Sequence, residues 1–270
     1  MRNKAVLGTL HVAAVLALCA AAVAAAVVAA PARAQSLPPG TAFSSGWTYE
    51  ASPYLWFAGV KGETRIGRRL PAVEVDASFS DLASDLDLGL MGAFEARKGR
   101  WGVLFDLFYI KLSADAEPLL PDRSGNNTAD LKQLLLQLAT AYRVLDNGTT
   151  SVDALVGARY ARTDVDVTLV PGLLRPSGTE GSGNVGWTDA FVGARILHAL
   201  SDRWSLVAYA DVGAAESDLS WQFIAGANYR FSNTLTGKFG YRALSMDYQQ
   251  PHFAYDIRTS GIYAGLGFRF

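Results

Sequence analysis

The sequence predicts an all-β protein built as a single antiparallel transmembrane β-barrel, and three observations support this. Apolar and polar residues alternate along many segments, including the last one, where every second residue is Phe270, Phe268, Leu266, Ala264 and Ile262. Such segments are long enough to cross a bilayer as tilted strands of about 9–11 residues. Charged residues gather on the face opposite the apolar one, and short turns alternate with longer connections, as a membrane barrel requires.

The first 45 residues are predicted to lie outside the barrel. Arg2 and Lys4 precede an alanine-rich apolar run, which ends in Pro31-Ala-Arg-Ala34. A basic start, an apolar middle and a small-x-small end are typical of a secretory signal peptide, so we expect residues 1–34 to be cleaved. A retained membrane anchor is the alternative. Residues 35–45 read as a disordered periplasmic leader, and residues 46–270 as the barrel.

Charge and cysteine content narrow the possible partners. The chain has 24 Lys and Arg against 25 Asp and Glu, and cleavage would remove Arg2, Lys4 and Arg33, leaving 21 against 25 and a net charge of about −4. Because no clustered basic surface is evident, we expect no nucleic-acid partner. The single cysteine, Cys19, lies in the expected signal peptide, so the mature chain would form no disulfide. We expect no cofactor and no metal site.

The strands follow one another with clear turns over most of the chain. Residues 47–57 read as the first strand, although Pro53 removes a backbone donor from it. From Asp87 onward the alternation is regular, and Asp146-Asn-Gly148 is a strong hairpin signal. The further strands are expected at about 87–97, 103–109, 134–142, 150–168, 187–197, 204–212, 221–231, 235–242 and 259–270, with residues 214–218 as a short connection.

Residues 59–86 are the hardest to interpret, and the strand count depends on them. Val73 to Phe79 alternates well, residues 60–67 alternate weakly, and residues 81–86 fit one or two helical turns. Strand direction requires an odd number of strands between residues 47 and 80. Three strands give a barrel of twelve, which we favour. One strand gives a barrel of ten, with residues 59–86 as a large outer loop or an inward plug.

Several segments resemble small outer-membrane β-barrel proteins of Gram-negative bacteria, broadly OmpA/OmpW-like. They are residues 94–102, 187–195, 201–206, 240–248 and 265–270. The resemblance implies an outer-membrane location, contact with membrane lipid, and a barrel with no settled biochemical role. It also implies that the C-terminal strand is the signal for the barrel-assembly machinery, carried by Phe270, Phe268 and Leu266.

Charged and amide side chains on the face opposite the apolar one are candidates to line the lumen. A cation at mid-membrane on the lipid face would cost about 2–4 kcal/mol, so these groups belong inside. Either they pair across the lumen and fill it, or a water-filled path remains with a weak anion preference. The candidates are Glu95, Arg97, Asp106, Gln137, Arg143, Asp153, Arg159, Asp189, Arg195, Arg230, Lys238 and Arg242.

These observations favour a small, narrow or occluded channel or structural barrel with a charged lumen, and not an enzyme. The alternative is a surface-interaction or adhesion barrel whose loops, Ala114–Asp130 and Pro171–Gly183, bind a host, phage or matrix partner. A remote alternative is a barrel hydrolase in which His252, between Asp247 and Asp256, activates water. His198 and Ser201 are better explained as polar residues at a strand end and turn.

Overall fold

The structure is a computed structural model, and it describes residues 46–66, 73–116, 127–169, 179–250 and 253–270. The expected signal peptide (1–34) and leader (35–45) therefore lie outside the described residues. No helix within the described ranges is long and apolar enough to cross a membrane.

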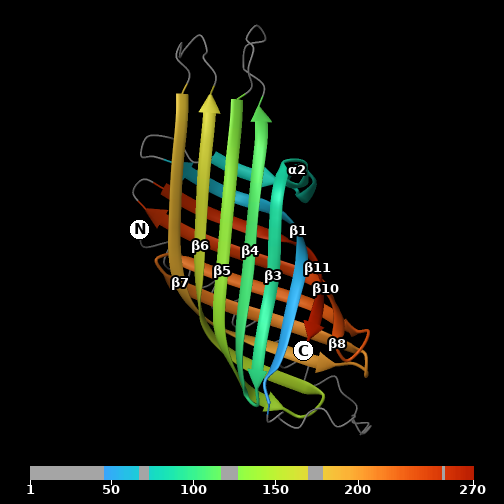
Figure 1. The fold of residues 1–270 in the computed structure, drawn as a ribbon. Coiled ribbons are helices and arrows are strands. Elements are labelled where there is room, and N and C mark those ends of the chain that lie inside the picture. The colour runs from blue at the N-terminus through green and yellow to red at the C-terminus, as the bar shows by residue number, and fades with distance from the viewer. Residues whose placement is uncertain (1–45, 67–72, 117–126, 170–178, 251–252) are drawn as a thin grey trace.

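Ten antiparallel strands form a closed barrel (Figure 1). Each strand pairs with the next along the wall, and β11 pairs with β1 to close it, from Glu50 opposite Arg269 to Ile66 opposite Phe253. The predicted antiparallel barrel is confirmed. The wall consists of β1 (Thr48–Ile66), β3 (Leu86–Lys98), β4 (Trp101–Ala116), β5 (Asn127–Asp146), β6 (Thr150–Leu169), β7 (Thr179–Ala199), β8 (Trp204–Ala215), β9 (Leu219–Arg230), β10 (Leu235–Gln250) and β11 (Phe253–Arg269).

The alternative count of ten strands is the one observed, and the favoured count of twelve is not. Residues 60–66 continue β1 instead of forming a separate strand. The ladder between β1 and β11 keeps one register from Tyr54 to Ile66, so no turn interrupts the strand. The well-alternating segment forms a short strand, β2 (Val73–Ala77), which pairs only with the outer part of β1. A six-residue helix, α2 (Phe79–Ser84), then leads into β3.

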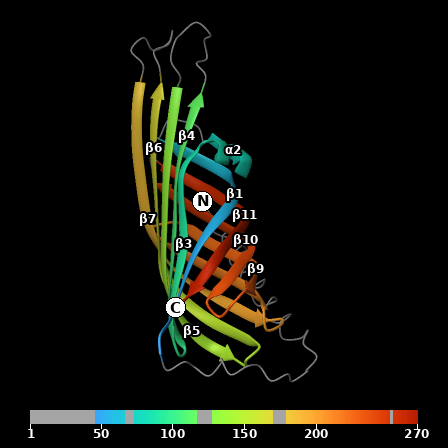
Figure 2. The ribbon, with the colours of Figure 1, turned by 45° about the vertical axis from the view of Figure 1, so that its right-hand side comes forward.

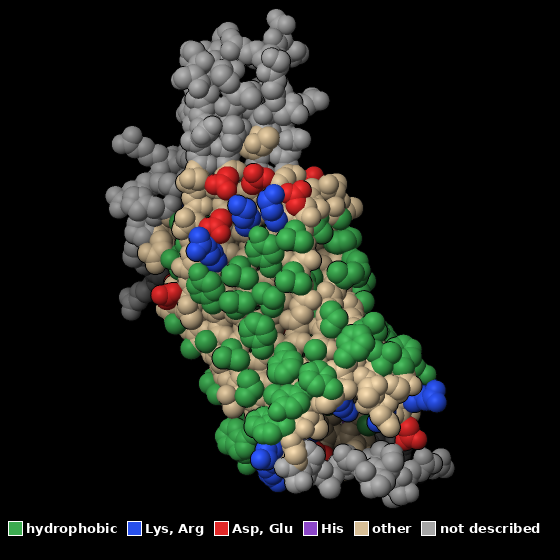
Figure 3. All heavy atoms as spheres, viewed as in Figure 1, with side chains coloured by type: hydrophobic (Ala, Val, Ile, Leu, Met, Phe, Trp, Pro, Cys, Tyr) green, Lys and Arg blue, Asp and Glu red, His purple; other side chains and the backbone are tan. Residues whose placement is uncertain are grey.

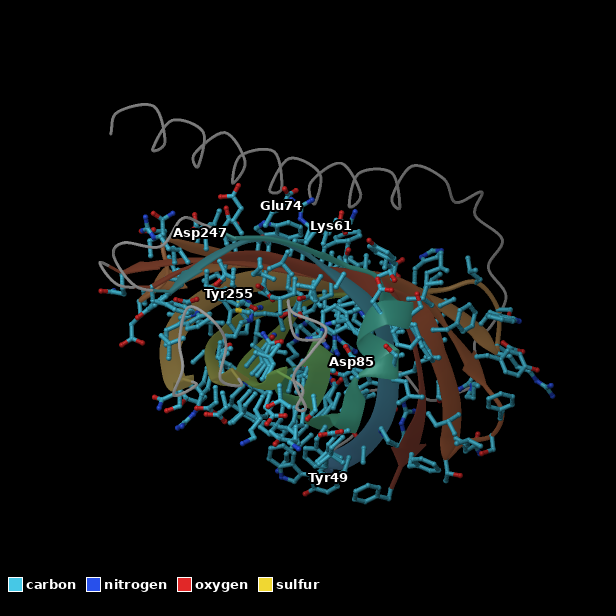
Figure 4. The ribbon with its side chains drawn as sticks, turned by 90° about the horizontal axis from the view of Figure 1, so that it is seen from above. Tyr49, Lys61, Glu74, Asp85, Asp247 and Tyr255 are labelled. Carbon is cyan, nitrogen blue, oxygen red and sulfur yellow. The ribbon has the colours of Figure 1, made fainter. Side chains whose placement is uncertain are left out.

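β1 and β3 are neighbours over only part of their length. Thr48–Pro53 pairs with Gly92–Arg97, and beyond this point the two strands diverge (Figure 2). β2 takes the place of β3 beside β1 from Val60 to Thr64, and the Phe79 ring of α2 lies 5.1 Å from the Phe57 ring of β1. Seen from above, α2 lies beside β1, with Asp85 at its end (Figure 4).

A belt of apolar side chains covers the outside of the barrel (Figure 3). Leu55, Leu90, Phe105, Val156 and Val192 are examples of large apolar residues that are exposed on the wall. Acidic and basic side chains gather at the upper edge of the belt (Figure 3). Towards the upper ends of β3, β4 and β6, Lys111 pairs with Asp87 and Arg162 pairs with Asp164. An apolar belt bounded by charges is what a bilayer requires of a membrane-spanning surface.

The two ends of the barrel differ. At the short-turn end, tight turns join the strands, and Gly148 in the predicted Asn-Gly turn has a φ of 85°, which favours glycine. At the other end, which we call the long-loop end, β5, β6 and β7 have 20, 20 and 21 residues, whereas β8 and β9 have 12 each. About 9–11 residues suffice to cross a membrane. β4–β7 therefore rise as a tall sheet beyond the rest of the wall (Figures 1 and 2).

Candidate functional site

A water-accessible vestibule occupies the short-turn half of the lumen. Its volume is about 660 Å³, and its lining carries eight Lys and Arg residues against five Asp and Glu residues. Figure 3 shows its mouth as a hollow at the lower end, with charged side chains inside. The lining cations are Arg97, Arg143, Arg195, Arg203, Arg230, Lys238, Arg242 and Arg269, and the acids are Glu50, Glu95, Asp106, Asp146 and Asp202.

The strongest cluster in the vestibule surrounds Asp153 of β6. Arg97 and Arg195 each lie 2.7 Å from the Asp153 Oδ2 atom, and the Arg143 Nε atom lies 2.9 Å from the Oδ1 atom. Arg195 also donates two hydrogen bonds, of 2.7 and 2.8 Å, to Glu95 on the far wall. Three arginines thus share these two carboxylates, with Asp146 as a further partner of Arg143 at 3.3 Å, and the cluster ties β3, β5, β6 and β7 together across the lumen.

The remaining wall of the vestibule is held by smaller pairs. Lys238 donates to Glu50 and to the Ser52 hydroxyl, and Glu50 also accepts from Arg269 at 3.1 Å. Arg230 lies at the mouth, where it donates to the Asp202 carbonyl. The mouth therefore has cations that meet hydroxyl and carbonyl groups, whereas the interior has compact ion pairs.

A layer of buried polar side chains closes the inner end of the vestibule. Arg159 binds both carboxylate oxygens of Asp211 at 2.7 Å, and Gln137 accepts from Arg159. Beside them, Arg242 donates to Asp106 at 2.9 Å and to the Tyr54 hydroxyl at 2.7 Å. These groups come from six different strands, so they brace the barrel as well as blocking it.

The outer half of the lumen is filled by apolar and aromatic side chains, which the sequence analysis did not anticipate. Trp56, Phe108, Leu135 and Trp187 belong to one buried cluster, together with Leu244, Met246, Tyr248, Tyr255 and Ile257. Trp187 stacks on Tyr248 at 4.7 Å, and Figure 4 shows Tyr255 inside the ring of strands. All lie at inward positions of the alternation, so the signal was present as large apolar residues interrupting the charged face.

The structure places all twelve lumen candidates on the inner side of the wall or at its rim. Eleven of them join the pairs described above, and Asp189 accepts instead from the backbone and hydroxyl of Ser217. Sequence reasoning missed the partners Glu50 and Asp211 and the Tyr209 hydroxyl, which donates to Asp211 at 2.6 Å. Counting in twos from Ser205 along β8 would have identified Tyr209 and Asp211 as inward-facing.

The histidine and serine considered for catalysis in the described ranges do not meet. The His198 ring lies 2.8 Å from the Thr150 hydroxyl, whereas Ser201 accepts from backbone amides of its own turn, so the two do not meet. His252 lies outside the described residues. Within the part of the chain that the structure describes, no three His, Cys, Asp or Glu residues are placed to hold a metal ion.

The C-terminal residues expected to carry the assembly signal lie on the outer surface. Phe270, Phe268 and Leu266 are exposed, and the Phe270 ring stacks on Tyr49 at 5.9 Å. The Phe270 amide and carbonyl bond with the backbone of Tyr49, so the end of the chain completes the barrel seam.

A closed antiparallel wall with an apolar outer belt and a polar, ion-paired interior defines the class of transmembrane β-barrels. The chain belongs to the outer membrane protein beta-barrel domain family, whose model matches residues 12–270. Its location is therefore the outer membrane, where its belt contacts lipid. In barrels of this kind the short turns face the periplasm and the long loops face outward.

Comparison with curated proteins gave no match. Among solved structures, the chain is similar to the outer membrane protease OmpT of Escherichia coli, with 9% identity, a TM-score of 0.49, and coverage of 86% of this chain and 99% of that one. It is also similar to Ail, the attachment invasion locus protein of Yersinia pestis, with 12% identity, a TM-score of 0.38, and coverage of 84% and 99%. The Pseudomonas putida toluene transporter TodX has 10% identity, a TM-score of 0.33, and coverage of 83% and 89%. At these values the similarities carry no argument about function.

Proposed function

We propose that this protein is a narrow, gated outer-membrane channel for small anionic solutes, and that its closed state is the conformation described above. The observation that carries the proposal is the periplasmic vestibule, whose lining has eight cationic side chains against five anionic ones, with the buried Asp153 carboxylate behind the lining as a sixth. A ring of Arg and Lys side chains favours anions in a pore. Residues that only fill a lumen would leave no cavity of this size.

Two barriers separate the vestibule from the outer end. The first is the polar layer around Arg159–Asp211 and Arg242–Asp106, and the second is the apolar cluster around Trp56 and Trp187. An apolar constriction excludes ions because its side chains offer no polar groups to replace the water that an ion would lose on entering. Passage therefore requires both layers to move, which makes the channel closed at rest.

Planar-bilayer conductance tests this proposal. We expect rare, small current steps from the wild type, and more frequent or larger steps from the double variant Trp56→Ala/Trp187→Ala, because two large buried side chains no longer fill the lumen. Val192→Ala, which removes an exposed outward side chain, serves as the control and should behave as wild type.

The reversal potential in a salt gradient should show anion preference, and Arg203→Glu/Arg230→Glu at the mouth should reduce this preference. Absence of current steps from the double variant, despite native heat-modifiable gel mobility, contradicts the channel.

A second candidate function is a surface-interaction barrel, and the length of β4–β7 favours it. Strands of 20 or 21 residues extend well beyond the membrane and present an exposed sheet as well as loops at the outer surface. The predicted binding segments Ala114–Asp130 and Pro171–Gly183 join these strands, although residues 117–126 and 170–178 lie outside the described ranges.

A further inference from the structure

The upper part of β7 is a free sheet edge. β7 pairs with β6 along its whole length, up to Thr179 opposite Leu169. On its other side, pairing with β8 ends at Asp189 opposite Ala215, where the chain turns back into β9. Among the described residues, no strand pairs with residues 182–187 on this side. We call residues 182–187 the free β7 edge.

The alternation of hydrogen bonds shows which backbone groups this edge presents. The Ala199 amide donates to the carbonyl of Thr149, directly before β6, whereas Thr188 exchanges bonds with Glu216 beyond the end of β8. Because the register has no shift between these residues, even-numbered residues of β7 point away from β6. Ser182, Asn184 and Gly186 therefore direct their amide and carbonyl groups at the open side.

The edge lies outside the apolar belt and lacks the usual protection. Gly186 is opposite Arg162 and Asn184 is opposite Asp164, which form an ion pair at the upper boundary of the belt. Exposed sheet edges in natural proteins commonly carry a lysine, a proline or a bulge, because an unprotected edge can pair with a strand of another molecule. The free β7 edge contains none of these, and a methyl group on Gly183 would meet nothing within 4 Å.

A second copy of the chain is a poor occupant of this edge. Two upright barrels related by an axis along the membrane normal would place identical residues of their β7 strands face to face. A parallel ladder instead bonds each residue to the two residues that flank its neighbour, so the symmetric arrangement leaves its groups mismatched. The geometry fits an extended segment of a different protein.

The two faces of the sheet beside the edge define the side chains of that segment. Half-buried Val185 and Val165 lie on the inner face, with Val185 packed against the lumen cluster. On the outer face, Asp164 is paired with Arg162, and half-exposed Asp166 has only a distant partner, Lys132 at 3.8 Å. An added strand would pair with β7, so its inward side chains would lie beside Val185 and its outward ones beside Ser182, Asn184 and Gly186. A long basic side chain passing over these short residues would reach towards the β6 carboxylates, one strand further on.

We propose that the free β7 edge binds an extended segment of a partner protein in which apolar residues alternate with basic ones. Main-chain hydrogen bonds to Ser182, Asn184 and Gly186 supply affinity, and the carboxylates supply selectivity, as in other complexes formed by strand addition. This inference rests on the second candidate function above and is independent of the channel.

The test uses the full barrel in phosphocholine nanodiscs and a labelled, end-blocked octapeptide of alternating valine and lysine. We expect binding by fluorescence anisotropy, with amide-exchange protection confined to residues 182–186. Asn184→Pro removes one edge-facing donor without touching the β6 ladder, and Asn184→Ala keeps that donor. The proline variant should bind at least tenfold more weakly and the alanine variant like wild type. The matching valine–glutamate peptide should not bind.

Peptides N-methylated at alternate residues keep the test informative if the proline variant fails to fold. Each of the two methylation registers removes the donors from one edge of the peptide, and the register that removes the donors facing β7 should not bind the wild-type barrel. Equal binding by Asn184→Pro, or by the methylated peptide in both methylation registers, overturns the edge site. Removal of residues 117–126 and 171–178 in separate variants then asks whether the loops bind the peptide. Binding that is lost only in those variants leaves the surface function standing while the edge inference fails.

Discussion

Arg159 donates to both carboxylate oxygens of Asp211 at 2.7 Å in the middle of the barrel. The Arg159 side chain is 1% exposed and the Asp211 side chain 0%. Tyr209, Gln137, Gln222 and Ser220 complete the hydrogen bonds of this pair. A buried ion pair of this kind is weak evidence of net stabilisation, but breaking it leaves a charge without compensation.

Asp211→Asn should therefore destabilise the folded barrel by about 3–5 kcal/mol, because the Arg159 charge remains buried without its counter-charge. The free energy of unfolding in urea, measured by tryptophan fluorescence in lipid vesicles, checks this. Asp164→Asn breaks the exposed pair with Arg162 and should cost no more than about 1 kcal/mol. Equal effects of the two substitutions would contradict the bracing role of the buried pair.

Gly261 lies at a close approach of β11 to β1, where the barrel closes. A Cβ atom there would lie 2.0 Å from the Phe57 carbonyl oxygen and 2.7 Å from the Ala58 Cα atom, both backbone atoms that cannot rotate away. Gly261→Ala should force the two strands apart and lower the free energy of unfolding by about 1–3 kcal/mol. The same urea titration measures it.

Gly183→Ala is the matched control for this glycine. It also lies in a wall strand, but a Cβ atom at that position meets nothing within 4 Å, so its effect should stay within about 0.5 kcal/mol. A Gly261→Ala barrel as stable as the wild type would show that the seam between β1 and β11 adjusts more easily than the geometry indicates.

The fold was largely predictable because the period of two assigns each side chain to the lipid or to the lumen. That logic placed Glu95, Arg195 and Asp153 inside, where they meet. It failed at residues 60–66, because β1 bends away from β3 to pair with β2, and weak alternation cannot distinguish a long strand from two short ones.

The packing of the lumen was not predictable from alternation alone. Trp56, Leu135 and Trp187 lie on the inner face, yet period two says only which side they take and not what they meet across the barrel. The contact between Trp187 of β7 and Tyr248 of β10 depends on barrel curvature and strand tilt. For the same reason the sequence left a filled lumen and an open one as alternatives, with the filled lumen favoured, and the structure shows an open half and a filled half.

The start of α2 should respond to acid through Asp81. Its carboxylate accepts from the side chain and amide of Ser78, which lowers the pKa of Asp81 below its usual value. Because the folded-state pKa is lowered, the cap contributes above the unfolded value of about 3.9 and is lost as pH falls through the folded pKa. A spin label at Ala83→Cys should therefore become more mobile at acidic pH.

Ser78→Ala removes the hydroxyl bond, the larger of the two that lower the pKa of Asp81, and keeps the backbone amide bond, so the midpoint of this mobility change should move upward towards the unfolded value. Ser84→Ala leaves the capping box intact and should keep the wild-type midpoint. Identical midpoints in all three proteins would show that Asp81 does not control the order of α2.

Phe270 allows assembly in the cell to be separated from stability of the folded barrel. Its ring is 71% exposed, and its backbone bonds to Tyr49 survive truncation of the side chain. Phe270→Ala should therefore refold in detergent with nearly wild-type yield and heat-modifiable gel mobility. In cells, we expect the amount of folded protein in the outer membrane to fall several-fold, because we propose that the assembly machinery reads Phe270, Phe268 and Leu266.

Phe231→Ala is the matched control, since Phe231 is an outward aromatic residue at the same end, 58% exposed, but it is not in the terminal strand. It should assemble normally in cells. If both variants, or neither, lose folded protein in the outer membrane, the terminal phenylalanine carries no special signal and its aromatic ring serves only as part of the interfacial belt.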